Sequence, residues 1–356
     1  MKKEFKIKIL AFVLFFSLNS YTEGEHKIFN LGNFDLESGV VLPNAKLSYV
    51  THGELNKEKD NLIFVPSAYL GDHHGFDFLI EPGKALDPNK YFIVATDMFQ
   101  NGLSSSPSNT PAPYDGPNFP LISIRDNVKA GHKLLTEEFG VKKIKSVVGF
   151  SMGAQQAFQW GVCYPYFVEK IVGIAGSAVE YPHGIVRLEG FIAAIKADQD
   201  FNEGQYTSPP EIGLRAGGAH WASWGWSQEW FRLGLYEEMG LNSTDEVIEW
   251  FEEFVLTWDA NNLIALARTW QNNNIGNTPG FEGDYTKALG SIKADVLYMP
   301  SETDMYFHID ALREEAKLIP GVKFRVIPSL WGHIAGAGFS PEDARFINDQ
   351  IEEFYR

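Results

Sequence analysis

The chain has 356 residues, 44% hydrophobic and 14% aromatic, enough for one large α/β domain with an insertion or for two smaller domains. Its formal net charge of −16 argues against nucleic acid and anionic membrane surfaces as partners. Its one cysteine, Cys163, excludes an intrachain disulfide and any metal site built from several cysteines, and its apolar helical surroundings predict a small buried side chain.

The first twenty residues have the pattern of a secretory signal peptide. Four lysines precede an apolar run over residues 9–18, and small polar residues follow it. Ten apolar residues are too few to cross a bilayer, so we expect no stable membrane span. The sequence therefore predicts that residues 1–20 are a signal peptide and that the protein is exported, to the periplasm or out of the cell.

Apolar strands alternate with helices through the first half of the chain. The helices are predicted from Ser123 to about Phe139 and from Met152 to Cys163. This alternation is typical of a mostly parallel, twisted sheet with helices on both faces. The apolar runs that predict the strands lie at residues 62–65, 91–96, 144–150 and 170–175, after a strand-like stretch over residues 29–55.

Two adjacent histidines, His73 and His74, follow the strand predicted at residues 62–65. They lie at the carboxyl edge of the sheet, where ligands collect in open α/β folds. Adjacent side chains on an extended loop point apart, however, and the sequence offers no further ligand cluster at a useful spacing. We therefore expect loop histidines that are solvated or hydrogen-bonded, and no metal site.

The pattern changes after residue 177. Residues 178–289 are mostly helical in pattern and hold seven of the nine tryptophans. Strand patterns then return at residues 295–299 and 323–327, with helices at 309–318 and 341–354. The sequence therefore predicts an α/β core over residues 28–177 and 290–356, with a helical cap inserted at 178–289.

A G-x-S-x-G pattern, Gly149 to Gly153, separates the strand at 144–150 from the helix that begins at Met152. Strand, sharp turn and helix are the context of a nucleophile elbow, in which the turn exposes a serine hydroxyl. The flanking glycines leave room where larger side chains would meet backbone. This context predicts Ser151 as a nucleophile and the Met152 N–H, at the positive end of a helix, as an oxyanion donor.

A serine nucleophile needs a base, which a carboxylate must orient. Asp304 follows the strand at 295–299, and His333 follows the strand at 323–327. The chain order Ser151, Asp304, His333 is the order that this kind of sheet requires. Glu302 is an alternative carboxylate, and His308 is an alternative base that we expect to be structural.

These residues resemble the homoserine O-acetyltransferase branch of the α/β-hydrolase superfamily. The resemblance covers most of residues 40–345 and implies an α/β-hydrolase fold, the triad Ser151, Asp304 and His333, and no cofactor. It also implies that the oxyanion donors are the backbone N–H groups of Met152 and Tyr69. The matching segments are residues 124–128, 147–160, 164–165, 303–304 and 332–333.

Two departures from that branch bear on the substrate. The transferases have a Gly-Ser-x-Gly-Pro loop where this chain reads Ser104-Ser105-Ser106-Pro107, and a cap arginine that clamps the amino-acid carboxylate where this chain has Gly218. Glycine cannot replace a planar bidentate contact, and Arg215 and Arg187 are the arginines that could substitute for it. The chain is therefore expected to be similar in fold and in acyl-enzyme chemistry, with a different substrate.

The function predicted from the sequence is hydrolysis of an ester or similar acyl substrate through an acyl-serine. A second hypothesis is an O-acyltransferase that moves an acyl group from coenzyme A to a hydroxyl, and a third is a non-catalytic binding protein on the same fold. We expect a small-molecule acyl ester or acyl donor as the partner, and we consider a homodimer.

Overall fold

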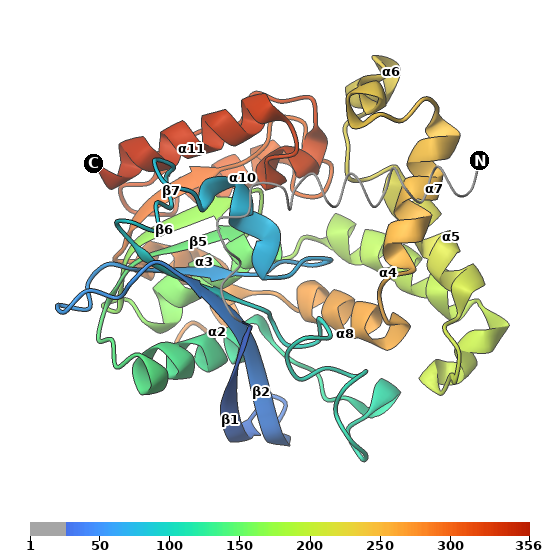
Figure 1. Cartoon of the computed structure of the whole chain (residues 1–356), viewed down its shortest axis with the longest axis horizontal. Helices are drawn as coiled ribbons and strands as arrows, with labels where there is room; N and C mark the ends of the chain where they lie inside the picture. Colours follow the sequence, from blue (N-terminus) through green and yellow to red (C-terminus); the bar gives the residue numbers. More distant parts are fainter. Residues whose placement is uncertain (1–25) are drawn as a thin grey trace.

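The computed structural model describes residues 26–356, and its centre is an eight-stranded sheet (Figure 1). The signal peptide predicted over residues 1–20 lies outside the described residues. The strand order is β1-β2-β4-β3-β5-β6-β7-β8; β1 and β2 pair antiparallel, as do β2 and β4, and the other neighbours are parallel. The strands are β1 (Lys27–Asp35), β2 (Val41–His52), β3 (Leu62–Pro66), β4 (Phe92–Thr96), β5 (Ile144–Phe150), β6 (Val168–Ile174), β7 (Asp295–Met299) and β8 (Lys323–Phe324).

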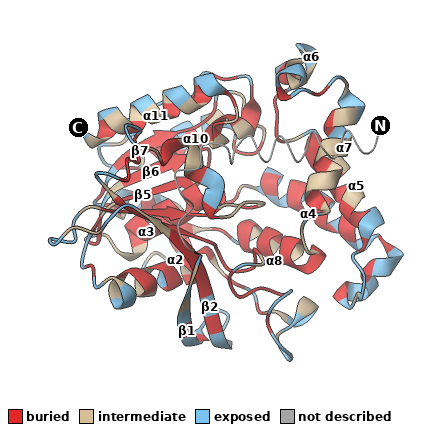
Figure 2. Ribbon diagram, in the orientation of Figure 1, coloured by how far each residue is buried: buried red, intermediate tan, exposed pale blue. Residues whose placement is uncertain are grey.

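The central strands are buried on both faces, as Figure 2 shows. Every residue of β3 and β4 is buried, which explains why these strands appear in the sequence as continuous apolar runs. Strand β1 pairs only with β2 and has five exposed residues, so it forms a polar edge. The predicted parallel sheet is therefore confirmed, with an antiparallel extension at its amino-terminal side.

Helices cover both faces of this sheet. Helix α3 packs against β5, β6 and α2, and Figure 1 shows α11 on the opposite side of the sheet from α2. Ser123 and Asp126 form a capping box that starts α2. The helices of this part are α2 (Ile124–Lys133), continued by a π-helical turn (Leu134–Glu138), α3 (Met152–Cys163), α10 (Ile309–Ala316) and α11 (Pro341–Tyr355).

The chain between β6 and β7 is helical, and α4 to α8, which we call the cap helices, lie to the right of the sheet in Figure 1. Helix α9, the last of this segment, contacts α3 beside the sheet. None of the helices in residues 26–356 is long and apolar enough to cross a membrane. The segment contains α4 (Pro182–Lys196), α5 (Glu211–Ala222), α6 (Gln228–Arg232), α7 (Thr244–Val255), α8 (Ala260–Gln271) and α9 (Tyr285–Ser291).

Short helical turns connect these elements. The prediction of one buried cysteine was wrong in part, because Cys163 is the last residue of α3 and is half-buried. Its Sγ lies 3.2 Å from Gln159 Nε2. The turns are η1 (His73–Leu79), η2 (Gly116–Asn118), η4 (Gln199–Gly204), η5 (Leu235–Met239), η6 (Ile275–Asn277) and η7 (Gly332–Ala337).

Candidate active site

Ser151 occupies a strained turn between β5 and α3. Its φ of 56° and ψ of −122° lie outside the regions that residues other than glycine favour. A Cβ on Gly149 would come within 2.0 Å of the Gly153 carbonyl oxygen, and a Cβ on Gly153 within 2.7 Å of the Pro66 oxygen. The two glycines of the pattern are therefore required by close backbone approach, as the sequence predicts.

The three predicted triad residues form one hydrogen-bonded chain. Ser151 Oγ lies 2.9 Å from His333 Nε2, and His333 Nδ1 lies 2.8 Å from Asp304 Oδ2. The other oxygen of Asp304 accepts the backbone N–H groups of Tyr306 at 2.7 Å and Phe307 at 3.1 Å. All three triad residues are at most 5% exposed, so water competes little for these hydrogen bonds.

The loops after β7 and β8 are tied together, which brings the acid to the base. Thr303 Oγ1 donates to the Ser329 carbonyl oxygen at 2.8 Å and accepts the Gly332 N–H at 3.1 Å. The alternatives lie elsewhere: Glu302 is exposed, and His308 is an exposed N-cap of α10 whose Nδ1 accepts the Asp310 N–H. Of the carboxylates and histidines considered from the sequence, the structure brings Asp304 and His333 together with Ser151.

The base loop is also fastened to the cap. The backbone N–H groups of His333 and Ile334 donate to the Gly225 carbonyl oxygen at 3.0 and 3.3 Å. Between the same two segments, Ser227 Oγ donates to the Leu330 carbonyl oxygen at 2.5 Å. The residues between α5 and α6 therefore help to hold His333 in place.

The predicted oxyanion donors lie on the two segments that follow β3 and β5. Met152 is the first residue of α3, where backbone N–H groups have no partner within the helix. Gln156 Nε2 donates to the Ser67 carbonyl oxygen at 3.0 Å and so attaches the loop that carries Tyr69 to α3. Within residues 26–356 neither N–H group has a protein acceptor, so both are available to a developing oxyanion.

Arg187 of α4, which the sequence offered as a substitute for the clamp arginine, lies close to His333 and Tyr306. Its guanidinium lies 3.9 Å from the ring centroid of Tyr306, which in turn stacks on His333 with centroids 4.2 Å apart. The residue is 3% exposed, and none of its three guanidinium nitrogens has a hydrogen-bond partner in the described chain. Burial lowers the pKa of Arg187, whereas Tyr306 and the carboxylates of Glu180 and Asp304 raise it.

Glu180 is a buried carboxyl whose charge interacts with that of Arg187. It accepts the Trp270 indole N–H at 2.6 Å and lies 3.4 Å from Gln155 Nε2. Burial raises the pKa of Glu180 to about 8, although the charge of Arg187 and these hydrogen bonds lower it in part. Sequence reasoning missed Glu180, because its neighbours Gln155 and Trp270 come from distant segments.

Replacing Glu180 by glutamine is expected to flatten the pH dependence of stability. The folded pKa of about 8 lies above the ordinary value of 4.5, so this group's contribution is complete below pH 4.5 and is lost as the pH rises toward 8. At about 1.4 kcal/mol per pKa unit, Glu180 lowers the free energy of unfolding by about 2 to 3 kcal/mol between pH 5 and pH 7.

Urea unfolding of the wild type and of Glu180→Gln at several pH values measures this difference. Glu315 and Asp343, whose pKa values burial raises to about 7 and about 6, remain in the variant, so its slope is reduced and not abolished. The exposed Glu302→Gln is the matched control and should follow the wild type. If the free energy of unfolding depended on pH in the same way in Glu180→Gln and the wild type, the raised pKa of Glu180 would be contradicted.

A cavity of about 360 Å³ lies between the cap and the loop that carries Asp304. Its lining is mainly apolar, and one lining residue, Met305, directly follows the triad acid. A space of this size suits a small ligand. The residues around it are Ser223, Trp224, Gln228, Phe231 and Met305.

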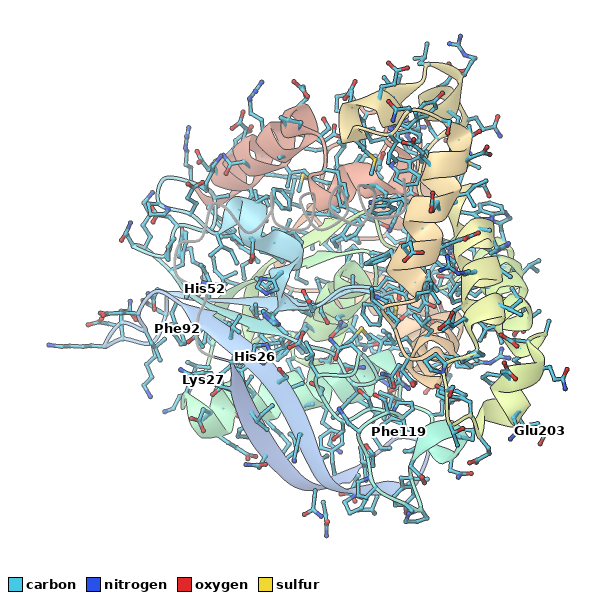
Figure 3. The ribbon with its side chains drawn as sticks, turned by 45° about the vertical axis from the view of Figure 1, so that its right-hand side comes forward. His26, Lys27, His52, Phe92, Phe119 and Glu203 are labelled. Carbon is cyan, nitrogen blue, oxygen red and sulfur yellow. The ribbon has the colours of Figure 1, made fainter. Side chains whose placement is uncertain are left out.

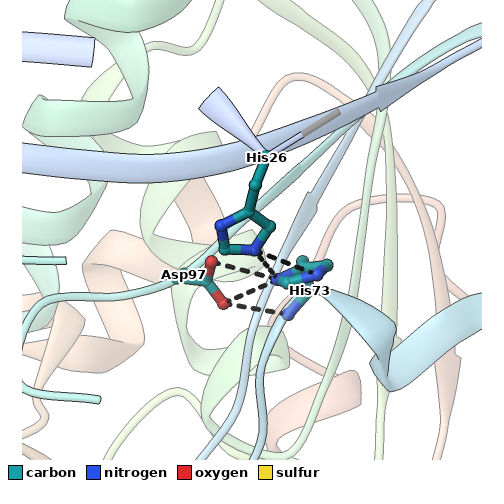
Figure 4. A group of neighbouring side chains, drawn as sticks. All are labelled: His26, His73 and Asp97. Atoms are coloured by element: carbon teal, nitrogen blue, oxygen red, sulfur yellow. Dashed lines mark hydrogen bonds and ion pairs between the residues drawn. The ribbon is translucent and has the colours of Figure 1, made fainter. Parts of the chain in front are cut away.

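The two loop histidines are hydrogen-bonded, as the sequence analysis expected. His74 Nδ1 lies 2.7 Å from Asp77 Oδ2, and His73 Nδ1 lies 3.1 Å from Asp97 Oδ2. The sequence did not indicate that His26 would join His73 and Asp97, as it does in Figure 4. These three residues could hold a metal ion, and they are discussed below.

Comparisons with known proteins agree with this geometry. Residues 61–337 match the family described as the alpha/beta hydrolase fold. The chain is 39% identical over 343 residues to the ethyl acetate hydrolase of Pseudomonas veronii, covering 94% of this chain and 97% of the hydrolase. An acetylester hydrolase structure from Corynebacterium glutamicum has a TM-score of 0.90 and 35% identity, covering 93% of this chain and 95% of that one.

Homoserine O-acetyltransferases are also similar, at lower identity over comparable lengths. The enzyme of Chlorobium chlorochromatii is 28% identical over 320 residues, covering 85% of this chain and 88% of the transferase. The resemblance expected from the sequence is therefore confirmed, and the two hydrolases named above share more residues with this chain than this transferase does.

Proposed function

Because this chain belongs to the α/β-hydrolase fold family, we propose that it is an esterase that hydrolyses small acyl esters, acetyl esters in particular. The observation that carries the proposal is the hydrogen-bonded chain from Ser151 through His333 to Asp304. The hydrolase names of its relatives from Pseudomonas veronii and Corynebacterium glutamicum support an ester of acetic acid as the substrate.

In the proposed mechanism, Ser151 Oγ attacks the ester carbonyl while His333 Nε2 takes its proton. Asp304 holds the ring so that Nε2 faces the serine, and it stabilises the imidazolium. The N–H groups of Met152 and Tyr69 bind the oxyanion. His333 then protonates the leaving alcohol as the C–O bond breaks. His333 next takes a proton from water as the water oxygen attacks the acyl carbonyl. It returns this proton to Ser151 Oγ as the acyl-serine bond breaks and the carboxylic acid is released.

The cap supports hydrolysis over transfer to homoserine. Gly218 lies where α5 crosses α7, and a Cβ there would come within 2.7 Å of the Glu252 Cα. An arginine does not fit at this position. The adjacent cap arginine, Arg215, already pairs with Glu252 and Glu253 at 3.3 and 2.9 Å. A non-catalytic binding protein is the weakest hypothesis, because binding alone has no need of the hydrogen-bonded triad.

Turnover of ethyl acetate, with and without homoserine as acceptor, tests the proposal. An esterase releases acetate at a rate that homoserine does not change, and it makes no acetylhomoserine from acetyl coenzyme A. Acetylhomoserine as the main product would instead establish the transferase. If neither donor were turned over and a fluorophosphonate did not label Ser151, the result would support the hypothesis of a non-catalytic binding protein.

We also propose that the protein is exported and that it forms a homodimer. The lysine-rich start followed by an apolar run supports export. Exposed apolar side chains on two neighbouring cap helices, Val186 on α4 and Ile212 on α5, at 71% and 75% exposure, support self-association. Cell fractionation tests the first proposal, and light scattering of the purified protein tests the second.

A further inference from the structure

Three side chains with metal-ligating atoms meet beside the carboxyl end of β4. They come from separate segments: His26 precedes β1, His73 begins η1, and Asp97 directly follows β4 (Figure 4). One donor atom from each lies within 4.8 Å of the others. His73 and Asp97 are buried, whereas His26 is exposed and closes the group from the solvent side.

Two of the three distances between the donor atoms fit neighbouring positions on a tetrahedral ion. His73 Nδ1 lies 3.1 Å from Asp97 Oδ2 and 3.3 Å from His26 Nε2. Zn²⁺ binds imidazole nitrogen at about 2.0–2.1 Å and carboxylate oxygen at about 2.0–2.2 Å, so neighbouring donors on a tetrahedral ion lie about 3.3 Å apart. His26 Nε2 also lies 3.3 Å from His73 Nε2, so it faces both ring nitrogens of His73.

The carboxylate of Asp97 is held in place by groups around it. Its Oδ2 accepts the Ser48 hydroxyl at 2.8 Å, and its Oδ1 accepts the His73 backbone N–H at 3.0 Å and the Asn101 Nδ2 at 3.2 Å. Hydrogen bonds of this kind orient the ligands of metal sites. Asp97 is therefore fixed toward His73 before any ion binds.

His52, at the end of β2, is a further histidine close to this group. Its Nε2 is buried and has no hydrogen-bond partner among residues 26–356. Burial lowers the pKa of His52, and the neighbouring His73 and His74 lower it further, while Asp77 raises it in part. Figure 3 shows His26 and His52 far from Glu203 of the cap segment.

We propose that His26, His73 and Asp97 bind a divalent transition-metal ion, Zn²⁺ by preference, with water completing the coordination. Two imidazoles and one carboxylate are ligands that Zn²⁺ takes in proteins. The ion links the residue before β1 to η1, which begins four residues after Tyr69. It is a structural site that anchors the start of the sheet, separate from the triad.

Metal titration of the full chain, without a histidine tag and after dialysis against a chelator, tests this proposal. The wild type is expected to bind one equivalent of Zn²⁺ and to gain thermal stability from it. His26→Ala and Asp97→Asn should each weaken binding by at least about tenfold and remove most of the rise in Tm. Co²⁺ in place of Zn²⁺ should give the visible absorption of a tetrahedral site.

His183→Ala is the matched control, because His183 is also an exposed histidine but lies on α4. It should bind Zn²⁺ as the wild type does. His26 is exposed, so His26→Ala tests the site without threatening the fold. No stoichiometric binding by the wild type, or equal binding by the wild type and both site variants, would overturn the proposal.

Discussion

Ser151→Ala is expected to lower kcat for acetate ester hydrolysis by about 10⁴- to 10⁶-fold, the largest loss that a single substitution in this chain should cause. Alanine removes the only atom that can form the acyl-enzyme. The strained backbone at position 151 remains, since alanine and serine have the same Cβ. Residual turnover would come from the oxyanion donors alone. Steady-state kinetics with ethyl acetate measures the effect.

Fluorophosphonate labelling separates a lost nucleophile from a lost fold. The wild type should be labelled at Ser151, Ser151→Ala should not be labelled, and His333→Ala should be labelled far more slowly because no base remains within 2.9 Å of the serine. Ser291→Ala, at the end of α9, is the serine control and should keep wild-type activity. Labelling that is unchanged in His333→Ala would show that His333 is not the base.

Asp304→Asn is the second large effect, with an expected loss in kcat of about 10⁴-fold. The amide oxygen can still accept the N–H groups of Tyr306 and Phe307, so the loop keeps its shape. The amide nitrogen then faces His333 Nδ1 as a donor. This favours the tautomer with the proton on Nε2, which cannot accept the proton of Ser151. The kcat of the folded variant measures the loss.

Glu302→Gln provides the matched comparison, because it makes the same chemical change two residues away on the same loop. Glu302 is exposed, so its variant should retain kcat within about twofold. A loss in Glu302→Gln equal to that in Asp304→Asn would assign the orienting carboxylate to Glu302 instead.

The residues that we propose as the triad could be predicted from the sequence because each depends on a local pattern. The turn at Ser151 needs glycine on both sides, and this requirement is visible in five letters. Asp304 and His333 each follow an apolar strand, and parallel strands end at the same edge of a sheet. Topology then brings residues together that lie far apart in the chain.

Features that depend on packing between distant segments could not be predicted. Helix α5 has no clear helical pattern because Gly213, Gly217 and Gly218 lower its propensity, yet these glycines allow the close approach of its neighbours. The helical pattern of residues 228–239 does not show that Gly234, with φ of 68°, divides this stretch into α6 and η5.

The last predicted strand was also too long. Its paired part ends at Phe324, after which only an isolated bridge joins Ile327 to Ser301. The surroundings of Arg187 could not be predicted either, because they depend on packing between distant segments. Tyr306 and Trp270, the rings nearest its guanidinium, come from a loop and a helix more than eighty residues further along the chain.

The attachment of the base loop to Gly225 bears on how this enzyme can be redesigned. A cap joined to a core only by its two connections could be exchanged between relatives as a module. Here the carbonyl oxygen of Gly225, a cap residue, holds the backbone of His333, the proposed general base. A graft that changes substrate preference must therefore conserve the backbone path at residues 225–227, or it will misplace His333 while every catalytic side chain is still present.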